Sequence, residues 1–442
     1  MLVRSFLFSA AMALTASAAS LPSSATYYKD VLPILQNRCQ GCHRPGEAGP
    51  MSFLTYKETR PWAKAIREAV LTKKMPPWLA DPHYGKFSND RSLSQAEIDT
   101  LVAWAERGGP EGNPKDAPAP VKFVEGWSIG KPDMVFEMPN EFDVPASGTI
   151  DYQYIVIPTH FTEDRWVRVA EARPGNRAIV HHMIAFVRPP GAKWMADAQP
   201  GVPFVPKRGQ AGTRRNENDD ITGTELLVGF APGMPPTDLL PGQAKLVKAG
   251  SDLVLQMHYT ANGKPGSDRS RIGLIFAQDP PTTRIYTTNT SNSKFVIPPG
   301  DPAYKVESSV ELAQDVKLID LMPHMHLRGK DFQYRAVYPT GETQVLLSVP
   351  KYDFNWQLTY FPKDPIVLPK GTRIECTAHF DNSPNNPANP DATHEVKWGD
   401  QSWQEMMIGW FDVALDMSQN PSELFKKHPA EIARKKPNPS DD

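Results

Sequence analysis

Proline makes up 45 of the 442 residues, about one residue in ten, and this frequency limits the length of helix that the chain can form. An average protein contains about half that share of proline. Because proline lacks an amide hydrogen and clashes with the preceding helical turn, long helices must be few. Proline is also favoured in tight turns, so the composition indicates short strands joined by stiff connections. The length predicts two to four domains.

Charge and hydrophobicity are those of an ordinary globular protein. Hydrophobic residues make up 40% and charged residues 22% of the chain, which argues against disorder and against a membrane bundle. The 48 basic and 50 acidic residues leave a formal net charge of -2. Electrostatics therefore offers no general attraction to nucleic acid or to anionic lipid, and we expect neither as a partner.

The N-terminus has the pattern of an export signal. Residues 1–19 carry one positive charge at Arg4, then an apolar run, then small residues at Ala16 and Ala18. This is typical of a signal peptide with an A-x-A cleavage site, and the apolar run is too short to span a bilayer. We expect a periplasmic or secreted bacterial protein with no stable membrane span after cleavage. With three cysteines, it cannot depend on a disulfide framework.

Two of these cysteines lie in RCQGCHRPG, residues 38–46, which contains the C-x-x-C-H signature of covalent haem c attachment. Cys39 and Cys42 lie one helical turn apart and can add to the two vinyl groups of one porphyrin, while His43 supplies the proximal iron ligand. A thioredoxin-like dithiol would need a βαβ context, and half a zinc site would need a second ligand pair. Neither is found in the sequence.

The flanking segments resemble a small cytochrome c domain, which we place at residues 24–112. Residues 25–39 fit an amphipathic helix, and residues 93–109 fit another with Ser94 as its N-cap and a stop at Gly108 and Gly109. The distal iron ligand is predicted to be Met75, because prolines after it would fix its loop. His83 is the alternative, and Met75 as a gap-filling core residue is a third interpretation.

The remainder of the chain reads as short strands. A proline-rich linker is expected at residues 113–130, followed by strand-like runs separated by Pro, Gly, Asn and Asp. We expect two antiparallel β-sandwiches, at residues 131–284 and 285–417. Residues 418–442 read as a tail with one short helix and a frayed end.

Histidine pairs and a methionine stand out within these strands. The segments that contain them are NRAIVHHMIAFV (176–187), DLVLQMHYTANG (252–263), LMPHMHLRGK (321–330) and WQEMMIGWF (403–411). His324 and His326 share one face of a strand and can chelate one metal ion, although buried histidines can also be satisfied by hydrogen bonds alone. His181 and His182 diverge on a regular strand, so both can bind one ion only with a bulge, a strand end or different ring nitrogens.

In this order, the four segments resemble the copper type II, ascorbate-dependent monooxygenases, the family of peptidylglycine and dopamine hydroxylases. The resemblance covers roughly residues 130–415. It implies two jelly-roll-like sandwiches, each holding one copper ion, on either side of a solvent-filled cleft. The implied ligands are His181, His182 and His258 for the electron-transfer copper, and His324, His326 and Met406 for the copper where oxygen reacts.

The ligand chemistry agrees with copper. Three imidazoles suit copper or zinc, two imidazoles with a thioether favour a soft ion such as Cu(I), and the lack of carboxylates disfavours magnesium and calcium. Met407 should point away from Met406, because alternate side chains of a strand face opposite sides. Both could also be core methionines. The remaining histidines are read as surface or hydrogen-bonded residues: His160, His379, His394 and His428.

Departures from the family concern the substrate and the third cysteine. Where the peptide enzyme binds a substrate carboxylate through an arginine, an asparagine and a tyrosine, this chain has Met322, Ile408 and Trp410. Losing these partners predicts a more apolar substrate. Cys376 resembles a disulfide cysteine whose partner position is here Met407, so we expect a buried free thiol.

Together these features predict a multidomain copper monooxygenase with an all-α cytochrome c domain. It would hydroxylate a C–H bond of a small substrate with O2, and a soluble one-electron donor, cytochrome-like or ascorbate-like, would reduce the haem. Two other classes use the same residues. One is a non-enzymatic haem and copper protein that transfers electrons or carries copper. The other is a zinc hydrolase with His181, His182 and His258 as its ligands.

Overall fold

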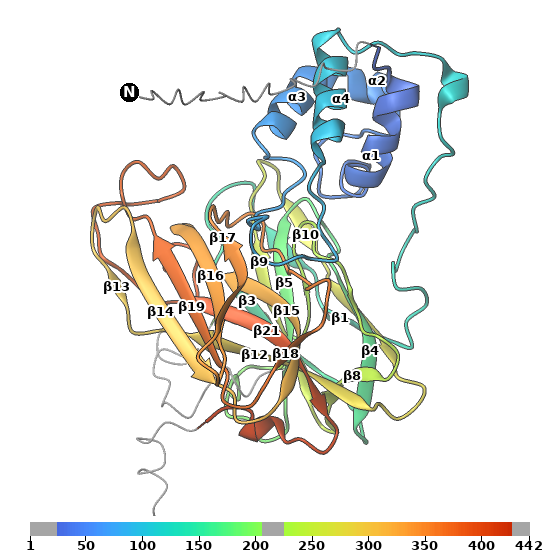
Figure 1. The fold of residues 1–442 in the computed structure, drawn as a ribbon. Helices are drawn as coiled ribbons and strands as arrows, with labels where there is room; N and C mark the ends of the chain where they lie inside the picture. The colour runs from blue at the N-terminus through green and yellow to red at the C-terminus, as the bar shows by residue number, and fades with distance from the viewer. Residues whose placement is uncertain (1–23, 206–224, 427–442) are drawn as a thin grey trace, which may run out of the picture. The chain divides into compact units, whose positions relative to one another are not determined.

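The computed structural model describes residues 24–205 and 225–426, so the expected signal peptide and His428 lie outside the described residues. Contacts divide the described chain into a helical unit and a β-rich unit. The helical unit comprises residues 24–44, 51–76 and 93–120, and the β-rich unit comprises residues 45–50, 77–92, 121–205 and 225–426. Strands far outnumber helices, as the proline content predicted (Figure 1).

The helical unit contains short helices around one core. A π-helical turn, Tyr27–Val31, precedes α1 (Leu32–Arg38), and α2 (Tyr56–Thr59), a 3-10 turn (Arg60–Trp62), α3 (Ala63–Leu71) and α4 (Gln95–Glu106) follow. Ser94 caps α4 as predicted, in a capping box with Glu97. The helix ends before Gly108, which has a positive φ of 77°. Leu35, Leu101 and Trp104 are fully buried in the core.

The first sandwich packs two sheets against each other. One sheet contains β3 (Gln153–Pro158), β9 (Asp252–Tyr259), β5 (Val180–Arg188) and β6 (Glu225–Phe230). The facing strands are β1 (Met134–Glu137), β11 (Arg271–Phe276), β4 (Arg165–Arg173) and β8 (Gln243–Val247), with β7 (Thr237–Asp238) beside β4. An antiparallel pair, β2 (Phe142–Val144) with β10 (Gly266–Asp268), lies outside these sheets. Buried aliphatic residues of both sheets form one continuous core.

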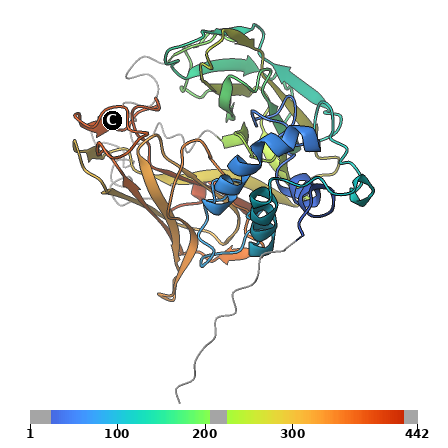
Figure 2. The same ribbon diagram turned by 90° about the horizontal axis from the view of Figure 1, so that it is seen from above.

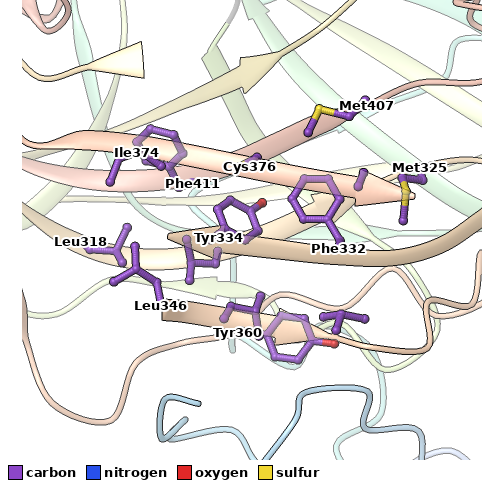
Figure 3. Packing of buried hydrophobic residues seen from close by; sticks show 14 of the residues in the cluster. Leu318, Met325, Phe332, Tyr334, Leu346, Tyr360, Ile374, Cys376, Met407 and Phe411 are labelled. Carbon is purple, nitrogen blue, oxygen red and sulfur yellow. The ribbon is translucent and has the colours of Figure 1, made fainter. Parts of the chain in front are cut away.

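The second sandwich repeats this plan. One sheet contains β14 (Tyr304–Glu311), β19 (Arg373–Phe380), β16 (Gly329–Val337) and β17 (Thr343–Val349). The facing strands are β12 (Thr283–Ser291), β21 (Ile408–Asp416), β15 (Val316–His324) and β18 (Ile366–Leu368). The strands β13 (Val296–Ile297) and β20 (Val396–Lys397) pair separately, and a 3-10 turn, Pro421–Glu423, follows β21. Aromatic and aliphatic side chains, including Tyr334 and Phe411, fill the core (Figure 3).

One sheet runs through both sandwiches. β8 of the first pairs in parallel with β12 of the second, through Thr283 with Gln243 and Arg284 with Ala244. The two sandwiches otherwise form separate stacks of strands, green and orange in Figure 2. The predicted boundary at residues 284/285 falls inside β12, because the whole of β12 pairs with β21 of the second sandwich.

Residues 77–92 belong to the β-rich unit, whereas we expected them in the haem domain. We call this segment the strap. The rings of Trp78 and Phe87 lie 5.0 and 5.5 Å from the ring of Tyr360, and the Asp81 amide donates to the carbonyl of Ser348 at 2.8 Å. Because of these apolar and backbone contacts, the strap belongs to the β-rich unit, although its neighbours in the sequence belong to the helical unit.

Two further expectations concern the proline-rich linker and membrane-spanning helices. In the predicted linker, residues 113–130, only a 3-10 turn at Pro114–Asp116 is regular. In the part of the chain that the structure describes, no helix has the length and hydrophobicity needed to cross a membrane.

Candidate metal centres

A β-bulge brings the first three histidines together. β5 pairs with β9 so that His182 lies opposite His258, but the register shifts between Val180 and His182. His181 is therefore an extra residue in β5, and a bulge re-aims such a residue. This is one of the three ways in which adjacent histidines could serve one ion. The ring centroids of His181 and His258 lie 5.0 Å apart.

The Nδ1 atoms of these histidines converge. The Nδ1 of His182 lies 3.1 Å from that of His181 and 3.3 Å from that of His258, and the three ligand atoms all lie within 4.8 Å of one another. Nitrogens bound at about 2.0 Å to one tetrahedral ion lie about 3.3 Å apart. The three histidines could therefore hold one metal ion through three nitrogens.

Burial keeps these imidazoles neutral. It lowers the pKa of His258 to about 3, with a smaller effect of His181, and it lowers the pKa of His182 well below its ordinary value. Neutral imidazoles have the free lone pair that a metal needs. The Nε2 of His182 is buried and has no hydrogen-bond partner among the described residues.

The second histidine pair is oriented by hydrogen bonds at Nδ1. The Nδ1 of His324 lies 2.8 Å from the side-chain oxygen of Gln357, and that of His326 lies 3.2 Å from the backbone carbonyl of Gln404. Such acceptors fix the proton on Nδ1 and leave Nε2 free for a metal. The Nε2 of His326 is buried without a partner among the described residues. Burial lowers the pKa of His324 to about 4.

Strand pairing links the methionine segment to the second histidine pair. The ladder of β15 with β21 ends where His324 pairs with Ile408, two residues after Met406. Opposite residues of an antiparallel pair share a face. Met406 packs in a cluster with Ile408 and Trp410, whereas Met407 lies in the core of the second sandwich (Figure 3). The two methionines therefore point to different sides, as their alternation predicted.

Glu405 accepts hydrogen bonds from the backbone next to the second histidine pair. Its carboxylate accepts from the amides of His326 at 2.9 Å and Arg328 at 2.6 Å. Burial raises the pKa of Glu405 to about 8, and these N–H donors oppose the rise. The sequence motif contains this glutamate, but its contacts with residues near 326 could not be predicted without the fold.

Two aromatic rings lie between the histidine groups. The ring of Tyr152 lies 4.6 Å from that of His258 and 6.4 Å from that of His326. The ring of Phe354 stacks on His181 at 5.4 Å and lies 5.9 Å from His326. The resemblance implied a solvent-filled cleft here, but in this structure aromatic side chains contact both groups. No sequence motif marked either residue.

The C-x-x-C-H segment forms a helical turn. The amides of Cys42 and His43 donate to the carbonyl of Cys39 at 3.1 and 2.9 Å. The Nδ1 of His43 lies 3.3 Å from the carbonyl oxygen of Met51, which leaves its Nε2 available as a ligand atom. Burial raises the pKa of Cys39 to about 12, which is the opposite of what a thioredoxin-like nucleophile needs.

The two candidates for the distal ligand lie in different units. Met75 is half-buried in the helical unit, and its amide donates to the carbonyl of Ala69 at 3.2 Å. His83 lies in the strap, where its side chain is 83% exposed and hydrogen-bonded to Asp81.

The other histidines and the third cysteine are as expected where they are described. The Nδ1 atoms of His379 and His394 lie 2.6 and 2.7 Å from carboxylate oxygens of Asp331 and Asp391. His160 is exposed. Cys376 is a buried free thiol.

No protein-family model matches this sequence, and no curated protein matches it. Among solved structures, the chain is similar to the VP2 subviral particle of infectious bursal disease virus, with 9% identity and a TM-score of 0.20 over 66% of this chain and 74% of that one. It is also similar to the major capsid protein of bacteriophage PM2, with 9% identity and a TM-score of 0.25 over 65% of this chain and 100% of that one. Likenesses with scores this low carry no argument about function.

Proposed function

We propose that this protein is a copper-dependent monooxygenase that hydroxylates a C–H bond of a small, apolar substrate with O2 and takes its electrons through a covalently attached haem c. The observation that carries the proposal is the convergence of three histidines. The Nδ1 atoms of His181 and His258 lie 3.1 and 3.3 Å from that of His182, and one ligand atom of each histidine lies within 4.8 Å of the others. A second set with a different donor chemistry lies in the same unit.

The donors fit copper at both centres. His181, His182 and His258 would hold one ion through three neutral nitrogens. His324 and His326 would hold the other through Nε2, together with the thioether of Met406. A thioether favours a soft ion such as Cu(I), so the second set is better suited to copper than to zinc. When bound, copper would supply one-electron transfer at the first centre and reaction with O2 at the second.

The residues around Met406 support an apolar substrate. Phe186, Leu226 and Ile408 pack with Met406 and Trp410 in one buried hydrophobic cluster, and Met322 lies at its edge. Met322, Ile408 and Trp410, which stand where the peptide enzyme binds a substrate carboxylate, thus belong to this hydrophobic cluster. An anionic group would be costly to desolvate there without a cation.

In this proposal, electrons would arrive through a haem that the C-x-x-C-H motif binds. Cys39 and Cys42 would bind the porphyrin, and His43 would bind the iron through Nε2, with Met75 proposed as the distal ligand. Oxygen cleavage needs two electrons per turnover, and a haem held by these residues would supply one-electron transfer from a soluble donor. The chain's own residues would hold the ligand imidazoles neutral, because burial lowers their pKa values.

The test follows the haem during reoxidation. Purified protein with established copper and haem contents is reduced without oxygen and mixed with air in a stopped-flow instrument, with wild type, Met406→Ala and Met407→Leu compared. We expect copper-dependent haem oxidation that Met406→Ala slows at least tenfold. Met407→Leu should match wild type, because it changes a core methionine for a residue of similar volume.

Haem oxidation that is equally fast without copper and in Met406→Ala, with and without candidate apolar substrates, would contradict the proposal. A non-enzymatic electron-transfer protein would give that result.

A further inference from the structure

Several buried polar atoms near the two histidine groups lack partners among the described residues. They are the hydroxyl of Tyr152 and the Nε2 atoms of His182, His326 and Gln357. Each of these residues is at least nine-tenths buried. A buried polar group without a hydrogen bond is costly, so such atoms mark places where a water molecule, an ion or a ligand binds. A metal would satisfy His326, but it would not satisfy Tyr152.

Tyr152 is held by both sandwiches. It directly precedes β3 of the first sandwich, and its amide donates to the side-chain oxygen of Gln401 in the second at 3.1 Å. Its ring lies 5.4 Å from that of His182 and 6.4 Å from that of His326. These contacts fix a phenol in the space between the two proposed centres.

Ionisable groups of the second sandwich influence the hydroxyl of Tyr152. They are Tyr352, Asp400 and Glu405. Glu405 binds the amide of His326, and the hydroxyl of Tyr352 accepts from the amide of Met325. Burial raises the pKa of Tyr152 well above its ordinary value, so the phenol keeps its proton and can act as a donor.

We infer that Tyr152 is a ligand-binding residue whose hydroxyl donates a hydrogen bond to a small acceptor molecule bound beside His326, dioxygen in the reaction proposed above. The inference rests on the proposed copper site. The ligand is placed at the second centre because oxygen would react there in the proposed function, and three protein donors leave a coordination position open. No covalent step is assigned to Tyr152.

Tyr154 provides a matched control. It lies two residues further on in β3 and is also buried, and its hydroxyl accepts a hydrogen bond from the side-chain amide of Gln256 at 2.6 Å. Tyr152→Phe and Tyr154→Phe therefore remove the same atom from neighbouring buried tyrosines. Only the first removes a hydroxyl that lacks a protein partner.

The experiment uses carbon monoxide as the probe on reduced, copper-loaded, haem-containing protein. The infrared stretch of carbon monoxide on copper is recorded for wild type and both variants, and visible spectra check that the haem has not bound it. A hydrogen bond to the ligand's oxygen lowers the stretching frequency. We expect Tyr152→Phe to shift the band to higher frequency and Tyr154→Phe to leave it in place.

The thermal midpoint of the metal-free protein provides a second measurement. Removing an unsatisfied hydroxyl should leave the midpoint of Tyr152→Phe unchanged or higher, whereas a structural hydroxyl would lower it. An unshifted band in Tyr152→Phe with normal copper content would overturn the inference and leave the proposed function standing. Wild-type protein that takes up no copper would overturn both.

Discussion

At the scale of single residues, burial is the main cause of the lowered pKa values of the histidines, ahead of neighbouring charges. The pKa of His258 is lowered to about 3 and that of His324 to about 4, and burial is the first cause in both. Neutral, buried imidazoles are ready for a metal ion but costly to protonate. The sequence identified these residues, yet it could not predict how strongly they are desolvated.

The lowered pKa of His258 predicts acid sensitivity of the metal-free protein. Between pH 6.5 and about 3 the unfolded chain binds a proton here that the folded chain excludes, so this contribution to stability is present above pH 6.5 and is lost as the pH falls through that window. Between pH 7 and pH 5 wild type should lose about 2 kcal/mol more than His258→Asn.

Urea unfolding of copper-free wild type and His258→Asn at pH 7 and pH 5 would measure this difference. Comparing the two proteins cancels groups that titrate in the opposite sense, such as Glu405, whose pKa is raised by burial. Equal pH dependence of both proteins would show that His258 is not the group responsible.

At the scale of elements, pairing partners decide where side chains point. The adjacent histidines of β5 serve one site because the ladder with β9 shifts by one residue at His181. The alternation of Met406 and Met407 was predictable, because a strand has a period of two residues. The bulge was one of three possibilities, since a bulge depends on the register with a strand about 75 residues away.

The strap should contribute to the stability of the second sandwich. Phe87 is 9% exposed and its ring packs against Trp78 and Tyr360. Phe87→Ala should lower the free energy of unfolding of the β-rich unit by about 3 kcal/mol, because it leaves a cavity. Tyr84→Ala, at an exposed position of the same segment, should change it by less than about 0.5 kcal/mol.

Chemical denaturation followed by tryptophan fluorescence would compare these variants, and limited proteolysis would report opening of residues 77–92. If Phe87→Ala and Tyr84→Ala behave alike, the strap does not stabilise the sandwich.

At the scale of the whole molecule, a buried lysine connects the two sandwiches. The Nζ of Lys245 in β8 donates to the carbonyl of Leu226 at 2.9 Å and to the hydroxyl of Thr287 in β12 at 2.7 Å. It also lies 2.9 Å from the carboxylate of Asp412 in β21. All three donors are used, and the lysine is 2% exposed. These contacts reinforce the short parallel pairing of β8 with β12.

Lys245→Met should destabilise the protein by about 3 to 5 kcal/mol, because it leaves Asp412 buried without its cation. The double variant with Asp412→Leu should recover part of this loss, since a matched apolar pair avoids the desolvation cost. Removing the exposed pair Arg168 and Asp238 should cost less than about 1 kcal/mol. Urea unfolding of Lys245→Met, Asp412→Leu, their double variant and the Arg168/Asp238 variant would test the coupling between Lys245 and Asp412. Additive effects of Lys245→Met and Asp412→Leu would argue against that coupling.

The sequence by itself determined the local features: few helices, the capped helix from Ser94 and the turn of the C-x-x-C-H motif. These depend on backbone geometry and residue period, which neighbours in sequence specify. The strand expected to carry both His324 and His326 ends at His324. Only the tertiary structure decided the bulge at His181, the place of the strap, the shared sheet, and Tyr152 and Phe354 between the histidine groups. Each of these depends on pairing and burial between residues far apart in sequence, which no local pattern encodes.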